Sequence, residues 1–182
     1  MEIIETGFEG LFVVKPKIYT DSRGYFFESY KHETFSKAGI IFTPVQDNES
    51  KSVRGVIRGL HYQLKPFDQA KLIRVVAGNI YDVAVDIRRD SKTYGKWFGI
   101  ELDSENKSQL FIPRGFAHGF SVLSETAVIQ YKCDNVYSPQ HERGIPIDDP
   151  YLKIDWKTDR SVWIISDKDL KHPAFKDAEN SF

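Results

Sequence analysis

The chain of 182 residues has a single cysteine, no large excess of charge of either sign and no long apolar run. One cysteine, Cys133, excludes an internal disulfide framework and a zinc site built from cysteines. A formal net charge of -1 provides no general attraction to nucleic acid or to an anionic membrane, so any anionic ligand must be held by a local cluster of cations. We therefore expect neither nucleic acid nor a membrane among its partners.

The N-terminus has no sign of a secretory leader. Residues 1–6 carry acidic side chains and no basic segment followed by an apolar one, and no apolar run elsewhere has the length of a bilayer span. We therefore expect a cytoplasmic location. The length and the hydrophobic content of 41% are typical of one globular domain, so residues 1–182 are predicted to form a single domain.

Aromatic residues are abundant, at 14% of the chain, and they occur in short runs that favour β-strands. Turn signals separate these runs, whereas only His32–Ala38, which Gly39 follows, has a convincing helical pattern. Many short strands with almost no helix predict an all-β sandwich or barrel. Gly78 and Asn79 stand between two apolar runs and predict a tight hairpin turn.

The sequence changes character after Pro139, where it becomes polar and rich in turns. We expect this part to wrap around the barrel rather than to form a second domain. The tail from Pro173 to Phe182 has weak structural signals and is expected to fray.

The segment Val56–Gln63 alternates apolar and polar residues and predicts a strand. In a regular strand Arg58 and His61 would point to opposite faces, and Gly59 between them can supply a bulge that brings them to one face. An imidazole and a guanidinium on one face can serve proton transfer and anion binding together. The alternative is a partly buried, hydrogen-bonded histidine within a sheet.

Three further polar clusters each allow a structural and a functional interpretation. Arg23 and Glu28 flank an aromatic run, which fits a hairpin strand or an arginine that holds phosphate with a forked contact. The polar run Gln46–Ser50 fits a loop or a set of groups that bind a sugar or a base. Lys71 begins an apolar strand, so its ammonium either reaches water or points inward to stabilise an enolate or a phosphate.

The second half of the chain adds three more candidates. His118 follows a Pro-Arg-Gly turn and enters a strand, where it could ligate a metal or contact a phosphate, but Gln63 near His61 is a poor ligand and argues against a metal. Tyr131 is either a packing residue or an acid that donates its proton to an enolate carbon. An aspartate of the charged run 166–169 is either solvated or orients an imidazole.

These signals are weak one by one, but their order along the chain is informative. The motifs are Asp-Ser-Arg-Gly-Tyr-Phe at 21–26, Val-Gln-Asp-Asn at 45–48, Arg-Gly-Leu-His at 58–61, Gln-Ala-Lys-Leu at 69–72, Ile-Pro-Arg-Gly-Phe-Ala-His-Gly-Phe at 112–120, Tyr-Lys-Cys at 131–133 and Ser-Asp-Lys-Asp at 166–169. Together they resemble the dTDP-4-dehydrorhamnose 3,5-epimerase family, and the resemblance covers essentially the whole chain.

The resemblance implies a cupin-type jelly-roll barrel with a few short helices, in a homodimer that exchanges N-terminal strands. It implies inversion of C3 and C5 of dTDP-4-dehydro-6-deoxy-D-glucose to give dTDP-4-dehydro-L-rhamnose, in dTDP-L-rhamnose biosynthesis. No metal and no redox cofactor is expected.

The resemblance also implies roles for individual residues. His61 matches the general base, Asp169 the carboxylate paired with it, Tyr131 the proton donor on the opposite face of the sugar, and Lys71 the group that stabilises the enolate. Tyr137 matches the aromatic residue that stacks on thymine. The other positions that match contacts to the nucleotide-sugar are Arg23, Glu28, Gln46, Asp47, Asn48, Arg58, His118, Glu142 and Lys168.

Other functions remain open at this point. An epimerase that acts at C3 alone, or a 3,4-ketoisomerase, would use a similar scaffold, although Tyr131 favours an epimerase because inversion needs an acid on the opposite face. A cupin-like module that binds a nucleotide or sugar without catalysis would need no acid–base pair. A metal-dependent cupin oxygenase is a further alternative, which Gln63 disfavours.

Overall fold

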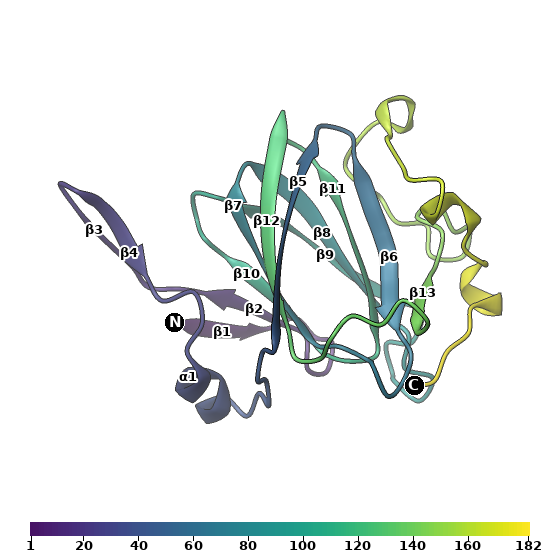
Figure 1. Cartoon of the computed structure of the whole chain (residues 1–182), viewed down its shortest axis with the longest axis horizontal. Coiled ribbons are helices and arrows are strands. Elements are labelled where there is room, and N and C mark those ends of the chain that lie inside the picture. The colour runs from purple at the N-terminus through teal and green to yellow at the C-terminus, as the bar shows by residue number, and fades with distance from the viewer.

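The computed structural model describes residues 1–182, and its core consists of two antiparallel sheets that face each other (Figure 1). The six-stranded sheet has the order β1 (Glu2–Glu5), β2 (Phe12–Lys15), β10 (Gln109–Ile112), β7 (Lys71–Ala77), β12 (Thr126–Cys133) and β5 (Gln46–Val53). The five-stranded sheet has the order β13 (Glu142–Gly144), β6 (Ile57–Gln63), β11 (Phe116–Val122), β8 (Asn79–Asp86) and β9 (Trp97–Asp103). The prediction of an all-β barrel is confirmed.

Alternating side chains separate the interior of the barrel from its outer surface. On β11, Phe116 and Phe120 belong to the core between the sheets, whereas Ala117 belongs to a second core on the outer face of the five-stranded sheet. The inner core also receives Leu110 from β10 and Ile129 from β12. Because both faces of the five-stranded sheet are covered, its central strands are buried on both sides.

The C-terminal segment covers the outer face of the five-stranded sheet, as the sequence predicts (Figure 1). Trp156 is fully buried there, and its indole N–H donates to the carbonyl of Ile147 at 2.7 Å. Three short 3-10 helices follow, and they are η1 (Arg160–Val162), η2 (Asp169–Lys171) and η3 (Phe175–Asp177). The tail, which the sequence predicts to be frayed, packs against this outer core: Phe175 is buried there, and Phe182 lies against the same cluster, because they find apolar partners that no local pattern reveals.

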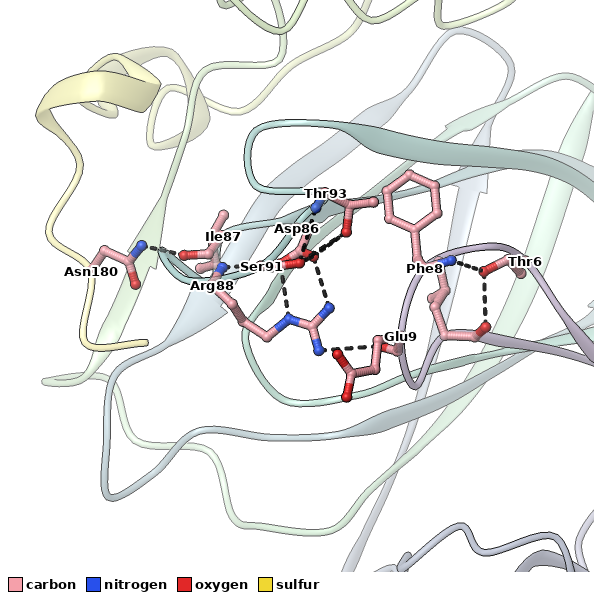
Figure 2. Close-up of polar contacts among 10 residues, drawn as sticks. Thr6, Phe8, Glu9, Asp86, Ile87, Arg88, Ser91, Thr93 and Asn180 are labelled. Atoms are coloured by element: carbon pink, nitrogen blue, oxygen red, sulfur yellow. Dashed lines mark hydrogen bonds and ion pairs between the residues drawn. The ribbon is translucent and has the colours of Figure 1, made fainter.

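Figure 2 shows the contacts that fasten both ends of the chain to the loop after β8. The buried carboxylate of Asp86 accepts two side-chain hydrogen bonds from Arg88, at 2.9 and 2.8 Å, and one each from Ser91 and Thr93, at 2.6 Å. Arg88 also donates to the carbonyl of Glu9 at 3.1 Å, and Asn180 donates to the carbonyl of Ile87. The N-terminal and C-terminal segments therefore meet around one satisfied carboxylate.

An N-terminal hairpin stands away from the barrel (Figure 1). It consists of β3 (Ile18–Asp21) and β4 (Gly24–Phe27), which pair only with each other. The predicted helix is confirmed as α1 (His32–Lys37), which buries Phe35. None of the helices has the length and apolar character needed to cross a membrane.

The predicted hairpin at Gly78 is wrong, and the loop interpretation of the polar run at Gln46 fails for the same reason. Gly78 has the expected positive φ of 81°, but the strands that flank it, β7 and β8, lie in different sheets, so the turn is a corner between sheets and not a hairpin. The polar run that starts at Gln46 is not a loop but β5, which pairs with β12 along its whole length. Both outcomes depend on long-range pairing, which the local sequence does not encode.

Candidate active site

A cavity of about 510 Å³ lies between the two sheets. It receives His61 from β6, Lys71 from β7, His118 from β11 and Tyr131 from β12, and Asp169 from the C-terminal segment. A neighbouring cavity of about 310 Å³ is lined half by amide and carboxylate side chains, and it shares His61, Lys71 and Tyr131 with the first. These three side chains therefore stand where the two cavities meet.

Gly59 brings Arg58 and His61 into this cavity together. His61 pairs with His118 and Arg58 pairs with Phe120, so β6 uses one residue more than β11 between the same two points, which is the predicted bulge. Gly59 has a φ of 128°, and a Cβ at this position would lie 2.5 Å from the Cα of Gly119. Only glycine combines this backbone conformation with so close an approach of the neighbouring strand, so the glycine at position 59 permits the bulge.

Asp169 is buried beside His61 and is hydrogen-bonded to it. The Asp169 Oδ1 atom lies 2.7 Å from His61 Nε2, and the backbone N–H of Gly59 donates to Asp169 Oδ2 at 3.4 Å. Burial raises the pKa of the Asp169 carboxyl, but the hydrogen bond and charge of His61 and the Gly59 amide outweigh it and hold this pKa below its usual value. The carboxylate is therefore ionised at neutral pH.

An ionised Asp169 fixes the tautomer of His61. A carboxylate only accepts hydrogen bonds, so His61 Nε2 carries a proton when the ring is neutral and Nδ1 carries the lone pair. The same carboxylate stabilises the imidazolium that forms when Nδ1 takes up a proton. This arrangement is that of a general base with an orienting acid.

Lys71 and Tyr131 approach the cavity from the other sheet. Burial lowers the pKa of the Lys71 ammonium, although nearby Cys133, Glu142 and Asp82 act in the opposite direction. Burial raises the pKa of the Tyr131 hydroxyl, so it stays protonated at neutral pH. The cavity therefore has a base on one sheet and, facing it, an acid and a cation on the other.

His118 forms a second histidine–carboxylate pair next to the first. Its Nε2 is hydrogen-bonded to Asp82 Oδ1, and Asp82 is fully buried on β8 with its Oδ2 left without a hydrogen-bond partner. His118 and His61 are register partners on adjacent strands. The sequence predicts the histidine but gives no signal for Asp82, because an aspartate within an apolar strand is not part of any short motif.

Several predicted binding residues form one connected network beside the second cavity. The Tyr137 hydroxyl and the Lys168 ammonium both donate to Glu142 Oε2. The backbone N–H of Tyr137 donates to the side chain of Gln46 at 2.9 Å, and Gln46 donates to Asn48 at 2.9 Å. The hydrogen bond to Glu142 is the main cause that raises the pKa of Tyr137 to about 12.

Three predicted binding residues lie away from both cavities within this chain. Arg23, on the tip of the β3–β4 hairpin, has a side chain that is 88% exposed and pairs only with Asp21. Glu28 follows the same hairpin and lies 3.9 Å from the ammonium of Lys31. Asp47 is on the outer face of β5, where Lys132 binds it at 2.6 Å.

The sequence analysis misses one histidine of the site, His172. Its Nε2 lies 3.6 Å from Asp169 Oδ1, and together with His61 these groups are the set of side chains best placed to hold a metal ion. However, His61 Nε2 and Asp169 Oδ1 are already bonded to each other at 2.7 Å, whereas zinc ligands stand roughly 3.3 Å apart when metal bonds are about 2 Å. The set therefore fits a proton relay better than a metal centre.

Gln63 also fits a structural role rather than a metal site. Its amide N–H groups donate to the carbonyls of Phe67 and Val136, and its oxygen accepts from the backbone N–H of Ser138. All its polar atoms are used to join two loops. It therefore holds these loops in place beside the second cavity, which it also lines.

Comparison with known proteins identifies relatives along the whole chain. A family model described as dTDP-4-dehydrorhamnose 3,5-epimerase matches residues 5–177. The protein of that name from Methanothermobacter thermautotrophicus is 50% identical over 168 residues, which cover 91% of this chain and 90% of that protein. The crystal structure of dTDP-4-dehydrorhamnose 3,5-epimerase from Elizabethkingia anophelis matches with a TM-score of 0.94 and 48% identity, over 97% of each chain.

A third relative was solved with a ligand. The dTDP-6-deoxy-D-glucose-3,5-epimerase from Legionella pneumophila, in complex with dTDP-4-keto-L-rhamnose, has a TM-score of 0.92 and 46% identity, over 96% of this chain and 93% of that chain. These identities and coverages are high enough to show membership of the family and not only a shared fold. The cupin-type fold that the resemblance implies is confirmed.

Proposed function

The chain belongs to the dTDP-4-dehydrorhamnose 3,5-epimerase family, an isomerase family, and from this we propose that it inverts C3 and C5 of dTDP-4-dehydro-6-deoxy-D-glucose. The product is dTDP-4-dehydro-L-rhamnose, an intermediate on the way to dTDP-L-rhamnose. The ketone at C4 acidifies the protons on both neighbouring carbons, so the substrate itself stabilises the carbanion and the reaction needs no redox cofactor. Independence of metal remains a prediction.

The observation that carries the proposal is the placement of a base and an acid on facing sheets. In this mechanism Nδ1 of His61 removes the proton from C3 or C5, and the electron pair of the C–H bond moves into the C4 carbonyl to form an enolate. Tyr131 then donates its hydroxyl proton to the same carbon from the opposite face, which inverts it. His61 on β6 and Tyr131 on β12 both line the cavity, from opposite sheets.

Charge in the cavity supports the enolate. Lys71 lies on the same sheet as Tyr131 and lines both cavities, so its ammonium would stabilise the negative charge that develops on the C4 oxygen. A preorganised cation in a partly buried site stabilises such a charge more than water does. Asp169 meanwhile stabilises the imidazolium of His61, so both charges formed by proton transfer have a partner.

The remaining residues would hold the nucleotide diphosphate. We assign the diphosphate to Arg58, His118 and Lys168, since all three present cationic or hydrogen-bonding groups to the cavity. In the network beside the second cavity, the half-exposed ring of Tyr137 offers a surface on which thymine can stack. Gln46, Asn48 and Glu142 would bind polar edges of the base or sugar, and Asp47 stays a prediction.

A homodimer that exchanges its N-terminal strands would explain the isolated hairpin. The β3–β4 hairpin leaves Tyr25 and Phe26 exposed, at 60% and 66%, which is unusual for aromatic residues on a free surface. We propose that the hairpin reaches the partner subunit and brings Arg23 and Glu28 to the partner's cavity. A cytoplasmic location stays a prediction.

Deuterium exchange tests the reaction. The purified protein is incubated with dTDP-4-dehydro-6-deoxy-D-glucose in D2O, and the sugar is followed by NMR. The proposed function requires solvent deuterium at both C3 and C5. Label at C3 alone would indicate an epimerase of narrower scope, while binding of dTDP without any exchange would indicate a binding module and overturn the proposal.

Mixed dimers test the strand exchange. Arg23→Ala and His61→Asn variants are each expected to be nearly inactive, and mixing them after denaturation and refolding should restore about a quarter of the wild-type activity, since random pairing gives half heterodimers with one intact site each. The His61→Asn protein refolded alone is the control. Failure of the mixture to exceed the two parents would show that Arg23 serves no partner site.

A further inference from the structure

His172 adjoins the His61–Asp169 pair but does not line either cavity. It follows η2, its side chain is only 12% exposed, and its Nε2 is buried without a hydrogen-bond partner. That nitrogen is 3.6 Å from Asp169 Oδ1, the same oxygen that His61 binds. The ring of His172 stands edge-on to that of His61, with centroids 5.8 Å apart.

The backbone opposite His172 is shaped to admit its ring. Gly144 on β13 is the register partner of His61. A Cβ on Gly144 would lie 2.3 Å from Nε2 of His172 and 2.4 Å from its Cδ2. Any other residue at 144 would displace the ring from Asp169, so the position of His172 is fixed by β6, β13 and η2 together.

We infer that His172 is a positioning residue for the base: as a neutral imidazole it directs its Nε2 proton at Asp169 Oδ1 and shares the charge of that carboxylate with His61. This inference rests on the proposed acid–base function of His61. A carboxylate oxygen has two lone pairs, so Oδ1 can accept the hydrogen bond of His61 and still attract the Nε2 proton of His172, which lies 3.6 Å away, just beyond hydrogen-bond distance. The shared charge keeps Asp169 turned toward His61 and limits how strongly it stabilises the imidazolium.

The charged groups around His172 support its neutral form. Burial and the nearby His61 lower the pKa of His172, Asp169 acts in the opposite direction, and Lys168 lowers this pKa further. On β13, Glu142 interacts electrostatically with His61, and its charge is balanced by an ion pair with Lys168. A second imidazolium beside His61 is therefore disfavoured, and His172 stays an N–H donor while His61 exchanges protons.

The test is the pH profile of kcat/KM in two variants. His172→Phe keeps a flat ring but removes the N–H donor, so the full charge of Asp169 acts on His61. The acid limb of kcat/KM should therefore move to higher pH by about half a pH unit. This corresponds to about a threefold loss of kcat/KM at acid pH, with no loss on the plateau. His172→Gln can place an N–H near Nε2 and should restore the wild-type profile. An unchanged limb in His172→Phe, or a His172→Gln profile that follows it, would overturn the inference.

A measurement without catalysis separates this inference from the proposed function. Nitrogen-15 NMR of the histidine rings in the wild-type protein should show His172 neutral with its proton on Nε2, throughout the range in which His61 titrates. In His172→Phe the midpoint of the His61 titration should rise. A wild-type His172 that carries its proton on Nδ1, or that becomes charged before His61, contradicts the inference even when deuterium exchange succeeds.

Discussion

Two of the buried aspartates of this chain, Asp86 at the end of β8 and Asp169 in η2 beside β6, differ in the kind of groups around them. Asp86 is enclosed by a guanidinium and two hydroxyl groups, which leave neither oxygen free (Figure 2). Asp169 has an imidazole and one long backbone hydrogen bond, with a second imidazole just beyond hydrogen-bond distance. None of the groups around Asp86 lines the cavity of the candidate site.

The difference lies in whether the partner of the carboxylate can change its charge. Arginine keeps its proton at all physiological pH values, so the Asp86–Arg88 ion pair stays charged throughout this range. Histidine gains and loses a proton near neutral pH, so the charge of Asp169 is balanced only part of the time. In the candidate site and beside it, the buried atoms without a hydrogen-bond partner include Asp82 Oδ2 and His172 Nε2, although Asn79 Oδ1 and Gln109 Oε1 elsewhere in the barrel also lack one. The Asp86 carboxylate has complete hydrogen bonding, whereas Asp82 and His172 retain capacity for further bonds.

The largest effect is expected from removing either member of the His61–Asp169 pair. His61→Asn and Asp169→Asn should each reduce kcat by about 10³-fold, because the general base is lost or misoriented. The temperature of thermal unfolding should stay close to that of the wild type, since the hydrogen bonding around Asp169 is incomplete in the wild-type protein as well. Rates of deuterium incorporation and melting curves measured on the same samples check both expectations. Activity above a few per cent in His61→Asn would refute the role of the base.

The opposite result is expected from Asp86→Asn. Loss of the charge leaves Arg88 without its partner, and breaking a buried ion pair of this kind lowers the free energy of unfolding by about 3 kcal/mol. Because Asp86 lies outside the cavity, kcat of the folded fraction should not change. Denaturant unfolding and single-temperature kinetics measure the two quantities, and a loss of kcat without a loss of stability would remove the contrast.

The contribution of Asp86 also has a predictable pH window. Burial raises its pKa, but hydrogen bonds from Arg88, Ser91 and Thr93 outweigh this and hold the pKa below its usual value. A depressed carboxyl pKa stabilises the fold fully above the unfolded value of about 3.9 and less as pH falls through the folded value. The stability gap between wild type and Asp86→Asn should therefore be constant from pH 7 to about 5 and narrow below about 4.

The smallest expected effect concerns Lys71. Because burial lowers the pKa of its ammonium, the alkaline limb of kcat/KM should fall below the value of about 10.4 of a free lysine. In Lys71→Arg the cation is permanent, so that limb should move to higher pH even if the plateau drops. An alkaline limb that is the same in both proteins would assign it to another group.

The sequence predicts the residues that touch the cavity better than those behind them. The pattern around Gly59 predicts the bulge, because glycine and a broken alternation are both local signals. Asp82 and His172 could not be predicted, since each acquires its partner only when distant strands pair. The corner at Gly78 shows the same limit: a positive φ is readable from the sequence, but the sheet that each flanking strand joins is not.

The bulge at Gly59 has a consequence for changes in chain length. Deleting this one residue would leave Arg58 and His61 as alternate residues of an unbroken strand. Ile57 and Leu60 would still face the outer core, so the alternation of apolar and polar residues would be preserved. The shortened strand would nevertheless draw Arg58 one residue nearer to His61 and remove the N–H that binds Asp169. Among homologous sequences, a gap at this position would therefore mark a barrel that keeps its fold and loses the spacing between its base and its anion-binding arginine.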